Sequence, residues 1–216
     1  MLTRATVESL IPILQRDARR ALSMRVPGFP SPYYCSFLLK DVDTFNTWAS
    51  AGSTGRSQTD RNRTVCCDLR VGSYEYDQVT DGGLRETDDE LESSSFHTLP
   101  IDDSSFDGLR ITLWRLLESK FREALADYNE RQASRISTPD PNKGIRSFVR
   151  VKRASSRRHS KLDTVDYDRW SKFCKRASLW MSMLPRLSGS WVEFDASQET
   201  RIFVSTEGSV TVQSSQ

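Results

Sequence analysis

The side chains best suited to metal or nucleophilic chemistry in this 216-residue chain are two histidines and four cysteines. They are His97, His159, Cys35, Cys66, Cys67 and Cys174. The cysteines form no C-x-x-C pair, and adjacent Cys66 and Cys67 point to opposite faces if they lie on a strand. Zinc sites need clustered thiolates or imidazoles. The spacing therefore predicts reduced thiols packed as small apolar side chains, with no zinc site and no disulfide scaffold.

A nucleophilic triad is the next chemistry to weigh. Ser94 lies near His97 and Asp102 in the sequence, and Cys66 and Cys67 carry thiols. No G-x-S-x-G elbow is present, and triad members seldom come from one short loop. We assign no catalytic, cofactor-binding or metal-binding residue to this chain.

Carboxylates gather in two places, Asp88-Asp89-Glu90 with Glu92, and Asp102-Asp103. Flexible carboxylates bind divalent cations weakly, and the spacing and glycine pivot of an EF-hand are missing. We expect a solvated acidic loop followed by a helix cap.

Basic residues concentrate between residues 143 and 176, with aromatic rings among them. Positive charge with stacking rings would suit nucleic acid. However, Trp170 and Phe173 fall on the apolar stripe of a predicted helix, and the net charge of the chain is only +2. We therefore interpret residues 139–162 as a solvated basic linker and expect no nucleic-acid partner. A free-standing regulatory or nucleic-acid-binding protein that uses residues 143–176 remains the alternative.

The first 24 residues carry charges that interrupt any apolar run, so they predict no signal peptide. No stretch approaches the ~20 apolar residues that span a bilayer. A cytoplasmic protein without a membrane partner is the expectation.

Three amphipathic helices are predicted. The first follows an apolar stripe from Val7 to Leu22, with a break or kink at Pro12. The second begins at the cap residues 102–105 and fades near Ser134. Its predicted buried stripe is Leu109, Leu113, Leu116, Leu117, Phe121, Ala124, Leu125 and Tyr128. The third runs from about residue 163 to 184, with Trp170, Phe173, Cys174, Ala177, Trp180, Met181 and Leu184 inward.

Short runs of aromatic and β-branched residues predict the strands. They are 33–39, 44–51, 64–71, 190–195, 201–205 and 209–213, separated by polar or Gly-containing turns, with 72–103 as a long acidic connection. Such short spacings favour an antiparallel meander. The fold class is therefore α+β, a mainly antiparallel sheet packed by two or three amphipathic helices in a single domain, 1–216.

Five segments in this order resemble the N-terminal half of the TldD/PmbA family, the metallopeptidase-related modulators of DNA gyrase. They are Pro32–Phe37, like P-Y-F-L-S-Y; Ala49–Gly52, like A-S-x-G; Asp68–Asp77, like V-x-V-R-V-G-x-x-x-x-D-N; 99–114, like L-P-x-D-D…L-R-x-x-L-W; and Arg201–Gly208, like R-x-F-V-N-S-E-G. Together they span residues 32 to 208. Gln78 and Ser205 depart from the pattern, because the family usually has asparagine at the first position and often at the second.

The resemblance implies an N-terminal domain that helps to enclose a chamber around a zinc site and admits unfolded peptide segments. It also implies a homo- or heterodimer with a TldD/PmbA-type subunit. The zinc motif of the family, H-E-x-x-x-H, places two imidazoles one helical turn apart with a glutamate as base, and His97 and His159 lack that spacing. Zinc is thus expected only in the C-terminal part of catalytic members. We expect a scaffold, dimerisation and peptide-access domain that is not catalytic by itself.

Overall fold

The fold is a long curved sheet with helices on one face, seen in a computed structural model that describes residues 2–79, 96–137, 144–159, 165–187 and 189–216. The helices are α1 (Arg4–Ala21), α3 (Asp107–Ser137) and α4 (Tyr167–Ser182). The strands are β1 (Pro32–Ser50), β2 (Ser53–Val71), β3 (Phe96–Thr98), β4 (Ser155–His159), β5 (Trp191–Ser205) and β6 (Val210–Ser215). Their sheet order is β3-β2-β1-β5-β6-β4, antiparallel except for the parallel pair β4 and β6. The predicted α+β class is confirmed.

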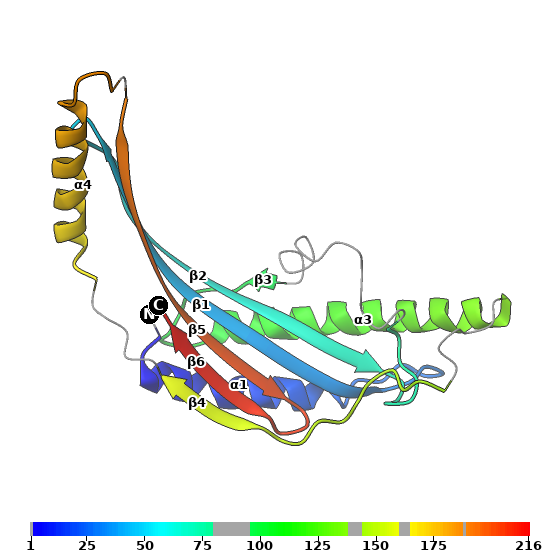
Figure 1. Cartoon of the computed structure of the whole chain (residues 1–216). Helices are drawn as coiled ribbons and strands as arrows, with labels where there is room; N and C mark the ends of the chain where they lie inside the picture. Colours follow the sequence, from blue (N-terminus) through cyan, green and yellow to red (C-terminus); the bar gives the residue numbers. More distant parts are fainter. Residues whose placement is uncertain (1, 80–95, 138–143, 160–164, 188) are drawn as a thin grey trace.

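Two parts of the sheet differ in what covers them (Figure 1). The body comprises α1, α3, β3, β4, β6 and the adjoining parts of β1, β2 and β5. The arm comprises residues 42–50 of β1, 53–62 of β2, 191–199 of β5, and α4. Three strands therefore leave the body and continue as a narrow ribbon with one helix against it.

The hydrophobic core lies in the body. Every second residue of β1 and β2 faces α1 and α3, so that Phe37, Leu39 and Val65 are fully buried. The predicted stripe of α3 is buried from Leu109 to Leu125, and Tyr128 packs half-buried at its end, as the sequence indicated. Each Å² of buried apolar surface contributes ~25 cal/mol to stability, so the body supplies most of the hydrophobic stabilisation of the fold.

Of the break or kink predicted at Pro12, the break is wrong, because helix α1 continues through this residue, while a kink stays a prediction. Thr3 caps the helix by accepting a hydrogen bond from the Thr6 amide. Pro12 itself is exposed, while Ile11 and Ile13 on either side are buried. The missing donor therefore falls on the solvent side of the helix, and the buried face holds the helix together across it.

Each of two long strands replaces two short predicted ones. The sequence divided 33–39 from 44–51 and 190–195 from 201–205, but β1 and β5 run without a break. Likewise, the polar segment 52–63 is the first half of β2 after a tight turn, not a loop. Ala51 and Gly52 both have positive φ, 46° and 80°, as the two-residue turn of a hairpin requires. Polar residues pair as strands here because both faces of a narrow ribbon can reach solvent.

Helix α4 packs on the three-stranded ribbon of the arm, and its buried residues are small. The inward face that the sequence predicted for this helix is mostly wrong. Only Cys174 and Ser178 are buried, and the Ser178 hydroxyl accepts a hydrogen bond from the Gly52 amide at 3.1 Å. Trp170 does stack on Phe194 of β5, with ring centroids 4.1 Å apart. Phe173, Trp180 and Leu184, by contrast, are more than half exposed. Small residues at Cys174 and Ser178 bring the helix close to the ribbon there, and Phe173, Trp180 and Leu184 remain outside.

Candidate interaction sites

The two histidines lie on the outermost strands at opposite edges of the sheet. His97 belongs to β3 and pairs with Val65, whereas His159 belongs to β4 and pairs with Ser214. Among the described residues, no group of three His, Cys, Asp or Glu side chains could hold a metal ion. The two histidines, at opposite edges of the sheet, thus do not fit the zinc motif of the family that the sequence resembles.

The adjacent thiols of Cys66 and Cys67 lack the environment of a nucleophile. A hydrogen bond with Cys35, together with burial, raises the pKa of Cys67 well above its ordinary value. Burial also raises the pKa of half-buried Cys66. Thiols with raised pKa values stay protonated at neutral pH and react slowly. Ser94 and the acidic run 88–92 lie outside the described residues.

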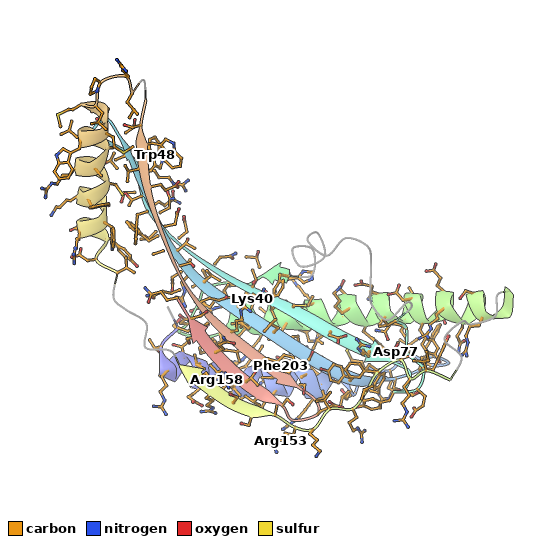
Figure 2. All side chains as sticks on the ribbon, in the orientation of Figure 1. Lys40, Trp48, Asp77, Arg153, Arg158 and Phe203 are labelled. Carbon is orange, nitrogen blue, oxygen red and sulfur yellow. The ribbon has the colours of Figure 1, made fainter. Side chains whose placement is uncertain are left out.

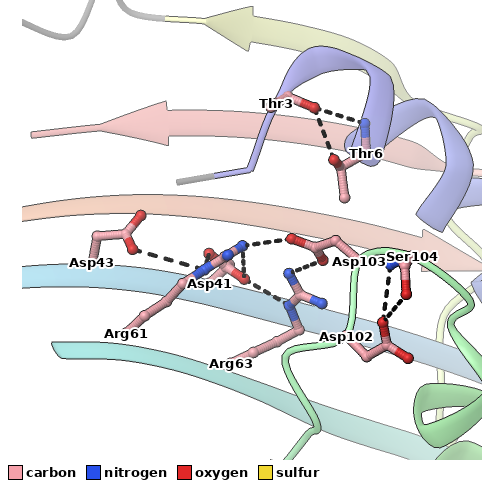
Figure 3. A network of polar contacts seen from close by, with 9 residues as sticks. All are labelled: Thr3, Thr6, Asp41, Asp43, Arg61, Arg63, Asp102, Asp103 and Ser104. Atoms are coloured by element: carbon pink, nitrogen blue, oxygen red, sulfur yellow. Dashed lines mark hydrogen bonds and ion pairs between the residues drawn. The ribbon is translucent and has the colours of Figure 1, made fainter.

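A charged network joins the body to the arm on the helix-bearing face of the sheet (Figure 3). Arg63 of β2 is fully buried and donates through Nε to Asp41 at 2.6 Å and through Nη2 to Asp103 at 2.7 Å. Arg61 also contacts both carboxylates, at 3.0 and 3.2 Å. Paired carboxylates compensate the buried guanidinium, which alone would be costly in this position. The network ties the two strands to the loop before α3.

Asp102 and Asp103 do not cap α3 as predicted, because the helix begins only at Asp107. Asp102 instead accepts hydrogen bonds from Ser104 and Ser105 in a turn before the helix. The hydroxyls of Ser104 and Ser105 lower its pKa. Although burial acts in the opposite direction, hydrogen bonds and charges from Arg63 and Arg61 lower the pKa of Asp103 below its ordinary value.

Three of the five TldD/PmbA-like segments meet at the end of the body away from the arm. Cys35 and Thr206 exchange hydrogen bonds of 2.9 and 3.1 Å between the first and fifth segments. Tyr33 donates to Asp77 of the third segment at 2.8 Å. Asp77 is completely buried and also receives a hydrogen bond from Arg70 at 3.1 Å; its position is marked in Figure 2. These residues fix the strand ends, which is a structural role.

The structure divides the basic residues of 143–176 among separate elements. Arg150 stacks over Tyr74 at the end of the body, at 4.7 Å. Arg157 and Arg158 lie on the edge strand β4, where Arg157 forms an ion pair with Glu8 of α1. A third group lies on α4, in the arm. Thus the basic face of the alternative hypothesis is split, and β4 lies within the predicted linker.

The outer surface of α4 and the tip beside it are the main apolar exposure of the arm. The exposed side chains are Phe173, Leu179, Trp180, Met183, Leu184, Leu187 and Trp191, with exposed fractions from 44% to 65%. Arginine is mixed among them, and the guanidinium of Arg176 lies 5.7 Å from the Trp180 ring. Sequence periodicity missed this site because it assigns large apolar residues to the interior.

Within the described residues, no helix has the length and apolar character needed to cross a membrane.

Comparisons with known proteins give structural likeness only. No family model matches the chain, and no curated protein matches it. A protein from Thermotoga maritima, described as a candidate modulator of a DNA gyrase, has a similar structure with a TM-score of 0.48 and 11% identity. TldE from Thermococcus kodakarensis is similar with a TM-score of 0.41 and 8% identity. The matches cover 95% and 97% of this chain but only 37% and 36% of those proteins.

Proposed function

We propose that this chain is a scaffold, dimerisation and peptide-access domain of a TldD/PmbA-type, metallopeptidase-related protein, and that it is not catalytic by itself. The observation that carries the proposal is the apolar outer surface of α4, which a three-stranded ribbon projects away from the body. Apolar patches of this kind mark surfaces that another protein covers.

The composition of that surface favours a protein partner. Phe173 and Trp180 are exposed on α4, and Met183 is exposed at its C-terminal cap. The guanidinium of Arg176 lies 5.7 Å from the Trp180 ring. Trp, Phe, Met and Arg are enriched in the centres of protein interfaces, where a few such residues carry most of the binding energy. The proposed partner is a second TldD/PmbA-type subunit, either another copy of this chain or a related one.

The sequence resemblance supports the family part of the proposal. Its five segments keep their order over residues 32–208, and three of them are joined by hydrogen bonds at one end of the body. Separation of His97 from His159 across the whole sheet supports the non-catalytic part. A zinc-bearing segment would therefore have to come from elsewhere.

Sedimentation velocity over a concentration series tests dimerisation directly. The wild-type chain is expected to shift from monomer to dimer as its concentration rises. The Phe173→Glu/Trp180→Glu variant should stay monomeric, because burying two unpaired carboxylates at the centre of the interface is costly. Arg122→Glu on the exposed side of α3 lowers the net charge by the same two units; it is the matched control and should associate as the wild type does.

Peptidase assays on the same preparations, with zinc added, test the remaining claim. Hydrolysis of unfolded peptide by the chain alone would overturn the non-catalytic assignment. A wild-type chain that remains monomeric at every concentration would overturn self-association, and mixing with a TldD/PmbA-type subunit would then decide the heterodimer.

A further inference from the structure

In the arm, the edge of β5 that points away from β1 has no neighbouring strand among the described residues. Strand β6 pairs with β5 only from Glu199 to Val204. On that side, residues 191–197 of β5 pair with no strand among the described residues, although their other side pairs with β1 throughout. Such an edge offers a row of backbone donors and acceptors to an added strand.

Two carboxylates lie side by side on the uncovered face of this edge. Glu193 and Asp195 alternate with Val192 and Phe194, which face α4. Asn46 of β1 holds both, since its Nδ2 donates to Glu193 at 2.7 Å and to Asp195 at 2.5 Å. Neither carboxylate forms an ion pair with any residue that the structure describes. One amide therefore fixes two negative charges without neutralising either.

Tryptophan rings flank the carboxylates. Trp48, labelled in Figure 2, lies opposite Glu193 in the pairing of β1 with β5. Its ring extends over Gly55, where an added Cβ would lie 2.0 Å from the ring. Exposed Trp191 lies across a hollow of about 520 Å³ that Trp48, Ser50 and Glu193 also line. Aromatic faces next to carboxylates suit guanidinium and ammonium groups, which the ring quadrupole attracts.

We propose that this edge of the arm binds an extended peptide with arginine or lysine at alternate positions, which adds to β5 as a fourth strand of the ribbon. The proposal rests on the peptide-access role above and names the class of peptide. Residues i and i+2 of an added strand share a face and stand directly opposite Glu193 and Asp195. The next residue on that face would reach Trp191. Backbone pairing supplies affinity, while the alternate basic side chains supply selectivity.

The same charges disfavour nucleic acid at this position. Arg56, a basic residue of this face, lies opposite Trp48 in the pairing of β1 with β2, and its guanidinium donates to Gln58 at 2.6 and 2.9 Å. The face therefore presents acid at the free edge of β5, which repels phosphate and attracts basic peptide.

Fluorescence anisotropy with a labelled peptide of alternating arginine and threonine tests the proposal on the full chain. We expect binding that weakens with salt, because exposed ion pairs are screened. A peptide of the same composition with its arginines contiguous should bind less tightly. The isosteric double variant Glu193→Gln/Asp195→Asn should weaken binding about three- to tenfold. Glu123→Gln/Glu130→Gln on the exposed side of α3 also removes two negative charges and is the charge-matched control, which should bind as the wild type does.

Two peptides N-methylated at alternate amides test strand addition. Only one set of alternate amides points toward β5, so one methylated peptide should lose binding and the other should retain it. Equal binding by both N-methylated peptides, or unchanged affinity of the double variant, would overturn the proposal. Because dimerisation is read separately by sedimentation of the α4 variant, loss of peptide binding alone would refute this inference and leave the scaffold role standing.

Discussion

The body and the arm are built on the same three strands but are stabilised in different ways. In the body, β1, β2 and β5 bury alternate side chains such as Phe37 and Ile202 under two helices. In the arm, the same strands meet one helix through Cys174 and Ser178, while Trp180 and Phe173 face outward. Since the arm exposes the kind of residues that the body buries, the comparison indicates which region supports the fold and which is available to partners.

The largest expected effect lies at the junction of the two regions. Asp41→Asn removes a buried carboxylate that contacts both Arg61 and fully buried Arg63. Among the described residues, partly exposed Asp103 is then the one carboxylate left to Arg63, so the free energy of unfolding should fall by about 3–5 kcal/mol. Urea denaturation measures it. Asp60→Asn, on the exposed face of β2, is the control. A loss no larger than that of the control would show that the network does not join body and arm.

Truncation of one large apolar residue in each region contrasts them directly. Leu113→Ala in the body removes a fully buried side chain and should cost about 2–5 kcal/mol of unfolding free energy. Phe173→Ala in the arm removes a side chain that is 54% exposed and should change it by no more than about 0.5 kcal/mol. Equal losses in thermal or urea unfolding of dilute protein would contradict the distinction between the regions.

A smaller effect is expected from Gly55→Ala in the arm. The new methyl group must displace the Trp48 ring, at a cost of about 1 kcal/mol, without touching the body core. Near-ultraviolet circular dichroism should report the moved ring, and binding of the basic peptide should weaken. Gly189→Ala, where no atom lies within 4 Å of the added Cβ, should leave the near-ultraviolet spectrum unchanged.

The smallest effect is a pH dependence at Asp103. Arg63 and Arg61 hold its folded pKa below the unfolded value of about 3.9. Its contribution to stability is therefore present above the unfolded pKa and is lost as the pH falls through the lower folded pKa. Asp103→Asn should reduce stability at neutral pH by under about 1 kcal/mol, because the side chain is partly exposed. In urea series, the difference from wild type should vanish in acid; a constant difference would contradict the assignment.

Periodicity predicts the body well and the arm poorly, for a physical reason. The buried stripe of α3, the core strands and the α+β class follow from apolar spacing, because in the body apolar residues do face inward. Strand segment 53–62 carries no such signal, since ribbon residues reach solvent on both faces. The inward face of α4 could not be inferred from residue size, because the helix contacts the ribbon through small residues. Ser178 contacts Gly52, and Cys174 contacts Thr47.

The candidate sites depend on long-range pairing that the sequence does not display. Arg61 and Arg63 occupy alternate positions of β2, and Asp41 of β1 pairs with Arg63, so the cluster could have been inferred only once the register was known. Asn46 meets Glu193 and Asp195 only because β1 pairs with β5 across almost 150 residues, and neither partner belongs to a local motif. The prediction that no catalytic residue lies in this chain remains a prediction.

Hydrogen exchange measured by mass spectrometry on dilute and concentrated samples tests most directly whether the arm is the surface that another subunit covers. Association should slow exchange in peptides from residues 167–187 and leave the amides of α1 and α3 unchanged. Protection that appears on α1 or α3 while residues 167–187 exchange at the same rate would contradict the account.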